Sequence, residues 1–203
     1  EESKEYTLVY DLDLKNLGRK INYTFNSSRD FTTPYGRIAY FLELQKIGEE
    51  TQFVYVSMDA FTTDITKIAV PTFESKASFQ TKVSNLNVIS NVPGIVTGKG
   101  LPGGNIEFWP SNYGPLNAKN IPNASATLWD FGDEPSEPSD GYGCMQVHNY
   151  EAKQTIFAIN QWKSGPSADI GIGNSTGKTR DWTFMSNASQ YEVKRLRVLV
   201  QTQ

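Results

Sequence analysis

The single histidine of the sequence lies in a segment whose side chains could do acid–base chemistry. It is the third residue of Gln-Val-His-Asn-Tyr (146–150), and on a β-strand Gln146, His148 and Tyr150 share one face. With an arginine on that face, these groups could neutralise the carboxylate of a uronic acid and abstract the neighbouring proton. The arginines considered for this role are Arg37, Arg195 and Arg197. The alternative, which we prefer, is a histidine that only forms hydrogen bonds with its neighbours.

Four tryptophans indicate a second kind of chemistry, the stacking of sugar rings. The apolar C–H faces of pyranose rings pack on flat aromatic rings, while amide, carboxylate and guanidinium groups bond the sugar hydroxyls. Trp162 follows Asn160 by two residues, and Trp182 follows Arg180 by two residues. We expect at least two of the four tryptophans to be buried, and Trp109 and Trp162 to lie at the surface.

These two groups of residues define the ligand-binding site that the sequence predicts. Arg195 and Arg197 belong to it because guanidinium groups pair with the sulfate or carboxylate groups of an anionic glycan. The expected ligand-binding residues are Trp109, Tyr113, Gln146, His148, Tyr150, Asn160, Trp162, Arg180, Trp182, Arg195 and Arg197.

An acidic loop over residues 130–143 predicts a cation site. Five carboxylates occur there within eleven residues. A Ca²⁺ ion takes about six to eight oxygen ligands, and it would also relieve the repulsion between these carboxylates. We expect a structural Ca²⁺ held by Asp130, Asp133 and Asp140. The alternative is a solvated acidic loop, because the spacing is not that of an EF-hand.

Other kinds of catalysis fit the sequence less well. The sequence has no Gly-x-Ser-x-Gly segment, and any serine or cysteine nucleophile would have to share the single His148. On a strand, Cys144 would lie about 13 Å from His148, so we expect it to be a small core residue. A glycosidase with two carboxylates stays open, because Glu107, Asp169 and Asp181 could face a cleft, but nothing selects a pair.

Charge and hydropathy argue against two classes of partner. The 203 residues carry 19 Lys+Arg and 22 Asp+Glu, a net charge of −3, whereas nucleic-acid binding needs a clustered basic surface. No run of 18 apolar residues is present that could cross a membrane as a helix. The sequence begins at Glu1 without a methionine or a signal-like stretch, so we expect a processed piece of a longer protein.

Apolar residues recur with period two in short runs, and turn residues interrupt them about every ten positions. The expected strands are 6–12, 37–44, 52–58, 83–90, 94–98, 105–109, 143–150, 155–162, 168–172, 182–184 and 191–201. Helical signals are nearly absent. We therefore expect one all-β domain over residues 1–203, a two-sheet antiparallel β-sandwich of the jelly-roll type, with its first and last strands paired.

Three long segments of the sequence are distinctive: GYGCMQVHNYEAKQTIFAINQW (141–162), ADIGIGN (168–174) and DWTFMSNASQYEVKRLRVLV (181–200). Together with YTLVYDLDL, RIAYFLEL, YVSMDAF and GNIEFWPSNYGP upstream, they span nearly the whole chain. In these segments the chain resembles the non-catalytic β-sandwich regions appended to secreted bacterial sialate O-acetylesterase-like and other carbohydrate-active enzymes. The resemblance implies a carbohydrate-binding role and supplies no catalytic residues.

The sequence thus leads to one function and two alternatives. We expect a secreted or cell-surface bacterial carbohydrate-binding module that targets a parent catalytic domain of the same polypeptide to a polysaccharide. The first alternative is a jelly-roll polysaccharide lyase that uses His148 and Tyr150 with an arginine. The second is a structural spacer or protein-interaction domain, which burial of all four tryptophans would favour.

Overall fold

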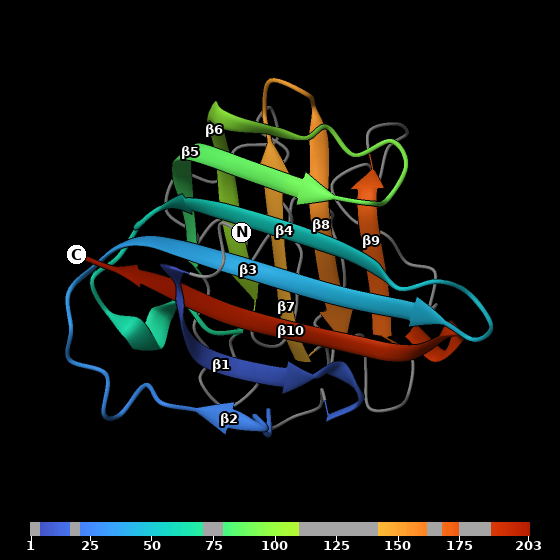
Figure 1. Cartoon of the computed structure of the whole chain (residues 1–203), viewed down its shortest axis with the longest axis horizontal. Helices are drawn as coiled ribbons and strands as arrows, with labels where there is room; N and C mark the ends of the chain where they lie inside the picture. The colour runs from blue at the N-terminus through green and yellow to red at the C-terminus, as the bar shows by residue number, and fades with distance from the viewer. Residues whose placement is uncertain (1–4, 17–20, 71–78, 110–141, 162–167, 175–187) are drawn as a thin grey trace.

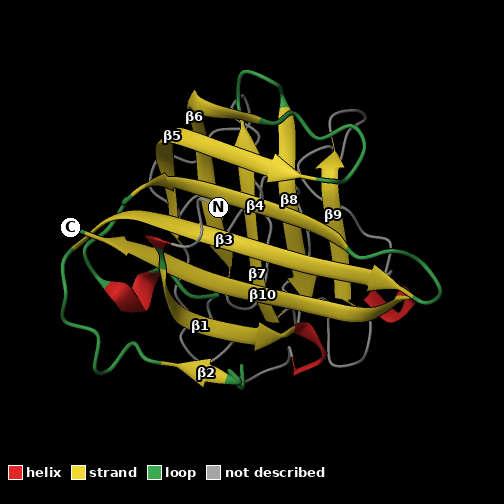
Figure 2. Ribbon diagram, viewed as in Figure 1, coloured by secondary structure: helices red, strands yellow, loops and turns green. Residues whose placement is uncertain are grey.

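The computed structural model describes residues 5–16, 21–70, 79–109, 142–161, 168–174 and 188–203. Within these residues the chain forms ten β-strands and three short 3-10 turns (Figures 1 and 2). The strands are β1 (Thr7–Asp13), β2 (Phe25–Asn26), β3 (Tyr35–Lys46), β4 (Gln52–Asp59), β5 (Phe79–Ser90), β6 (Gly98–Trp109), β7 (Tyr142–Asn149), β8 (Gln154–Gln161), β9 (Ala168–Asn174) and β10 (Tyr191–Thr202). The 3-10 turns are Leu14–Asn16, Ile65–Lys67 and Ala188–Gln190. The prediction of an all-β chain is confirmed.

All ten strands belong to one antiparallel sheet with the order β2-β1-β10-β3-β4-β5-β6-β7-β8-β9. From β3 to β9 the strands follow one another in the sheet as they do in the sequence, which is a meander. The last strand, β10, lies between β1 and β3, so the first and last strands pair as expected, with Leu196 opposite Leu12. The antiparallel prediction is confirmed, whereas the finer prediction of two sheets in a jelly roll is not.

The period-two pattern explains which face of each strand is buried. In β3 the side chains of Ile38, Tyr40 and Leu42 are fully buried. Phe41, between Tyr40 and Leu42, and Glu43, which follows Leu42, are only half-buried. The same alternation in β10 buries Leu196, Val198 and Val200. Each of these strands therefore has one apolar face toward the core and one face toward the outside.

The sheet folds back on itself, so that its two halves face each other. In Figure 1, β3, β4 and β10 run across the front of the molecule, and β7, β8 and β9 run behind them in a different direction. The ring centroids of Tyr40 on β3 and Phe157 on β8 are 6.4 Å apart, which places the two halves in contact. One hydrophobic cluster contains buried residues of both halves. The apolar face of each half is thus removed from water by the other half.

β5 and β6 connect the two halves and carry the irregular backbone that this fold requires. The pairing of β5 with β6 shifts between Leu86 and Val88, and Asn85 and Gly100 have positive φ angles of 55° and 62°. Such irregularities bend and twist a strand pair. Gly104 on β6 lies so close to β7 that a Cβ atom added to it would overlap the carbonyl oxygen of His148.

We predict that Gly104→Ala lowers the free energy of unfolding by about 3 kcal/mol or more, because the new methyl group collides with backbone atoms. Gly103→Ala is the matched control on the same strand. Its added Cβ would lie 3.8 Å from the nearest atom, the carbonyl oxygen of Val83, so we expect a change of less than about 1 kcal/mol. Urea unfolding followed by circular dichroism measures both. Equal losses for the two variants would contradict this account of the β6–β7 contact.

Candidate functional site

Gln146 and His148 lie on the same face of β7, as expected, and both are buried, with exposed fractions of 2% and 0%. On the neighbouring strand β6, Asn105 is opposite His148 and Glu107 is opposite Gln146, and both are fully buried. Opposed residues of antiparallel strands project to the same side of the sheet. These four side chains therefore form one buried group, which we call the β6–β7 polar cluster.

Two short hydrogen bonds connect three members of the β6–β7 polar cluster. Asn105 Nδ2 donates to Glu107 Oε1 at 2.6 Å, and Asn105 Oδ1 lies 2.6 Å from His148 Nδ1. The NH₂ end of the Asn105 amide is thus directed toward Glu107 and its carbonyl end toward His148. A carbonyl oxygen only accepts. Nδ1 of His148 therefore carries a proton, and in the neutral ring the lone pair is on Nε2.

The fourth member, Gln146, has a different environment. Within the part of the chain that the structure describes, neither Nε2 nor Oε1 of its buried amide has a hydrogen-bond partner. A buried polar group without a partner costs about 1–3 kcal/mol, so such groups are rare. The polar cluster thus combines an oriented imidazole with an amide that is ready to bond a further polar group. This arrangement can accept a proton or hold a polar ligand.

The arginines considered as partners of His148 lie on the other half of the sheet. Arg195 Nε donates to Asp11 Oδ1 at 2.7 Å, a second nitrogen of Arg195 pairs with Asp11 Oδ2, and these bonds raise the pKa of Arg195. Arg197 Nε is 3.9 Å from the same Oδ2 atom. Both residues are on β10, and Arg37 is on β3, whereas four strands separate β10 from β7 in the sheet. The structure does not bring these arginines together with His148.

The remaining predicted residues are placed only in part. Tyr150 is half-buried in the turn after β7, and its N–H donates to the carbonyl of Gly103 at 3.1 Å. Trp109 and Asn160 belong to β6 and β8. The expected residues that lie outside the described part of the chain are Tyr113, Asp130, Asp133, Asp140, Trp162, Arg180 and Trp182.

Among the described residues, no group of three or more His, Cys, Asp or Glu side chains could hold a metal ion. No helix in the same ranges is long and apolar enough to cross a membrane.

The outward surface of β3 and β4 carries aromatic rings that the sequence analysis did not select. The Phe41 ring centroid is 6.0 Å from that of Phe53 and 6.3 Å from that of Tyr55, and the Tyr6 ring meets Tyr55 edge-on at 6.4 Å. Tyr55 is buried, and the other three are half-buried. We call these four residues the aromatic face. The alternation of Phe53 and Tyr55 with buried valines was the signal that could have revealed it.

Charged side chains border the aromatic face. The guanidinium carbon of Arg197 lies over the Phe41 ring, 5.4 Å from its centroid, which is a cation–π contact. Nη2 of Arg197 is also 3.7 Å from Glu43 Oε1. The Arg197 guanidinium therefore interacts with both the Phe41 ring and the Glu43 carboxylate.

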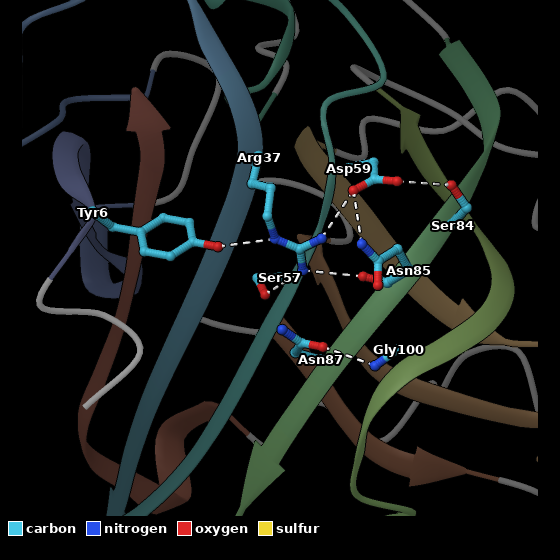
Figure 3. Close-up of polar contacts among 8 residues, drawn as sticks. All are labelled: Tyr6, Arg37, Ser57, Asp59, Ser84, Asn85, Asn87 and Gly100. Carbon is cyan, nitrogen blue, oxygen red and sulfur yellow. Dashed lines mark hydrogen bonds and ion pairs between the residues drawn. The ribbon is translucent and has the colours of Figure 1, made fainter. Parts of the chain in front are cut away.

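At the other end of the aromatic face, Arg37 joins four parts of the chain (Figure 3). Its Nη1 donates to Asp59 Oδ1 at 2.9 Å, and its Nη2 donates to Ser57 Oγ at 2.8 Å and to the carbonyl of Asn85 at 3.0 Å. Nε donates to the hydroxyl of Tyr6 at 3.1 Å. These four bonds fix the guanidinium and tie β3 to β4, to β5 and to the residue before β1.

The bonding of the β6–β7 polar cluster predicts the tautomer of His148. In ¹⁵N NMR of the imidazole near neutral pH, Nδ1 is expected to show the shift of a protonated nitrogen and Nε2 that of a nitrogen with a lone pair. The signal is unambiguous because the sequence has one histidine. Asn105→Ala removes the acceptor and should lose this preference, whereas Glu107→Gln keeps an acceptor for the Asn105 amide and should retain it. A wild-type ring protonated only on Nε2 would contradict the assignment.

Comparisons with known proteins gave no match for this chain. No family model matches the sequence, and neither a curated protein nor a solved structure matches it. The functional argument for this chain therefore rests on its own residues, above all on the aromatic face and the β6–β7 polar cluster.

Proposed function

We propose that the chain is a non-catalytic carbohydrate-binding domain and that the aromatic face is its binding surface. The observation that carries this proposal is the group of half-buried rings of Tyr6, Phe41 and Phe53 on the outward surface of a rigid sheet. Flat rings on adjacent strands present an apolar surface on which the C–H patches of successive pyranose rings can stack. Arg37 and Asp59, which hold each other in place at the border of the aromatic face, can form hydrogen bonds with sugar hydroxyls.

The charges around the aromatic face favour a neutral glycan. The arginines at its border are Arg37, Arg195 and Arg197, and the carboxylates paired with them are Asp11, Glu43 and Asp59. The three positive groups are thus each paired with a negative group. An anionic glycan would have to displace existing ion pairs, whereas a neutral glycan can bind without breaking them. We therefore infer a neutral polysaccharide rather than a uronic or sulfated one.

The proposal includes the setting of the domain. We propose that it belongs to a longer secreted or cell-surface bacterial protein and keeps a parent carbohydrate-active enzyme near its polysaccharide, in line with the resemblance of its sequence. In this proposal the two facing halves of the sheet act as the layers of a sandwich. Glycan contacts from Trp109, Tyr113, Trp162 and Trp182, and a structural Ca²⁺ at Asp130, Asp133 and Asp140, belong to the same proposal.

One observation favours the second candidate function, a polysaccharide lyase. The hydrogen-bonded chain from Glu107 through Asn105 to His148 orients an imidazole as a proton acceptor, which is what elimination from a uronate requires. Elimination also requires a positive charge beside the uronate carboxylate to stabilise the charge that develops. The arginines considered for that role are paired with carboxylates on the other half of the sheet. We therefore prefer carbohydrate binding to catalysis as the proposed function.

We predict that Phe41→Ala and Phe53→Ala each weaken binding to a neutral polysaccharide about 5- to 30-fold, the equivalent of about 1–2 kcal/mol per lost ring contact. Affinity electrophoresis in gels with neutral, uronic and sulfated polysaccharides, run with and without a chelator, measures this. Ile47→Ala is the matched control, because Ile47 is a large apolar side chain with an exposed fraction of 74% that lies outside the aromatic face. Its retention should equal that of the wild type.

Absorbance of unsaturated sugars in the same samples separates the candidate functions. Retention without product, lost in the two phenylalanine variants, is the expected result. A product whose formation disappears in His148→Ala would replace the binding proposal by a lyase. Absence of both retention and product in the wild type would leave a spacer or protein-interaction domain.

A further inference from the structure

A pocket of about 360 Å³ lies where β3 begins and β10 ends, and its lining residues are not those of the aromatic face. This volume falls in the range of about 300–1,000 Å³ typical of small-molecule sites. Apolar walls come from Phe31, Tyr35 and Ile65, and polar groups come from Thr33, Thr63 and Gln203. None of the described residues that line the pocket is charged.

Tyrosine hydroxyls hold one wall of this pocket in place. Three of them donate to backbone carbonyls of the segment 65–70, which includes the wall residue Ile65. The pairs are Tyr10–Ile65 at 2.9 Å, Tyr40–Ile68 at 2.7 Å and Tyr23–Val70 at 3.3 Å. Burial raises the pKa of each of these phenols, so all three remain neutral donors. The segment is therefore fixed before any ligand arrives.

Tyr35 is the fourth tyrosine of this group and differs from the others. Its side chain is nine-tenths buried and lines the pocket, and within the described ranges its hydroxyl has no hydrogen-bond partner. The Phe31 ring packs against it at an angle of 62°, with centroids 6.3 Å apart. A phenylalanine would fill the same space without burying an unpaired hydroxyl. Unlike the other three hydroxyls, the hydroxyl of Tyr35 therefore does not help to hold the segment 65–70 in place.

The electrostatics of the pocket indicate the class of its ligand. Burial, with a smaller contribution from the charge of Asp64, raises the pKa of Tyr35 to about 12. The phenol is therefore protonated near neutral pH and can donate a hydrogen bond. The described lining residues offer no positive charge to an anionic ligand. A neutral molecule with hydroxyl groups and an apolar face fits these conditions.

We propose that this pocket binds one neutral sugar residue, with the Tyr35 hydroxyl bonded to a sugar hydroxyl and the Phe31 ring against the apolar face of the sugar. Thr33, Thr63 and Gln203 supply further hydrogen-bonding groups. Thr63 and Gln203 are exposed, so their side chains can change rotamer and admit the ligand to Tyr35. The pocket and the aromatic face are separate sites, and the two proposals have only the class of ligand, a carbohydrate, in common.

Titration of the whole chain with methyl glycosides of glucose, galactose and N-acetylglucosamine, followed by ¹H–¹⁵N NMR, tests the proposal. At least one glycoside should shift the amide signals of Thr33, Tyr35, Thr63 and Gln203 more than those of the aromatic face. Tyr35→Phe should raise the Kd about five- to tenfold through the loss of one hydrogen bond. The same variant should raise Tm by about 2–4 °C, because a buried unpaired hydroxyl is removed.

Ser90→Ala is the control, since it removes a hydroxyl that donates to the carbonyl of Phe53 at 2.6 Å and that does not line the pocket. It should lower Tm and leave the Kd unchanged. The proposal is overturned if no glycoside shifts the pocket signals, if Tyr35→Phe leaves the Kd unchanged, or if Tyr35→Phe lowers Tm as a structural hydroxyl would. Phe41→Ala distinguishes the two sites, because it should weaken binding to polysaccharide and leave the pocket titration unaltered.

Discussion

The return of one continuous sheet onto its own apolar face is the constraint on which the rest of this structure depends. A single ten-stranded layer would leave one apolar face in water, so the two halves must cover each other. That closure needs backbone irregularity at β5 and β6, where Asn85 and Gly100 adopt positive φ angles. It also needs a close approach of β6 to β7 at Gly104, where no side chain fits. The next pair of the same β6–β7 ladder, Asn105 opposite His148, belongs to the polar cluster.

The two outward surfaces of the folded sheet have different properties, and this difference separates the functional hypotheses. Over β6 and β7, polar residues such as Glu107 and His148 are fully buried and bonded in a chain. Over β3 and β4, half-buried rings such as Phe41 and Phe53 are surrounded by paired charges. Stacking on a glycan needs an accessible aromatic surface, whereas proton transfer needs an oriented imidazole. The described residues hold both kinds of chemistry, but Arg37, Arg195 and Arg197 lie on the side of the rings.

The sequence predicted most of the strands, because period-two burial is a local property. The predicted strand 94–98 was wrong, since residues 94–97 are a turn and loop before β6, and the predicted strand 182–184 lies outside the described residues. Ile38, Tyr40 and Leu42 on β3 are buried as the alternation requires, and the terminal strands pair. The alternation shows which face of each strand is buried, but not which strands pack against each other. It could therefore not predict that a single sheet folds back on itself. Likewise Gln146 and His148 were recognisable on β7, but their partners on β6 depend on a cross-strand register that local pattern does not encode. The aromatic face could not be predicted, because its rings come together only through the pairing of β3 with β4 and the packing of Tyr6 against Tyr55.

The buried polar side chains of this molecule differ in whether they have hydrogen-bond partners, and this difference affects stability. Tyr10 and Tyr40 follow the usual rule, since each buried hydroxyl meets a carbonyl, and the fold gains a rigid segment from them. Gln146 and Tyr35 break the rule within the described residues, although an apolar residue of similar shape would suit either position better for stability alone. Removing such a group would stabilise the chain, but natural proteins are rarely at their stability optimum, so an unpaired group can persist. The sugar proposed for the pocket would supply the missing partner of the Tyr35 hydroxyl, so that the cost of leaving this hydroxyl unpaired would be recovered on binding.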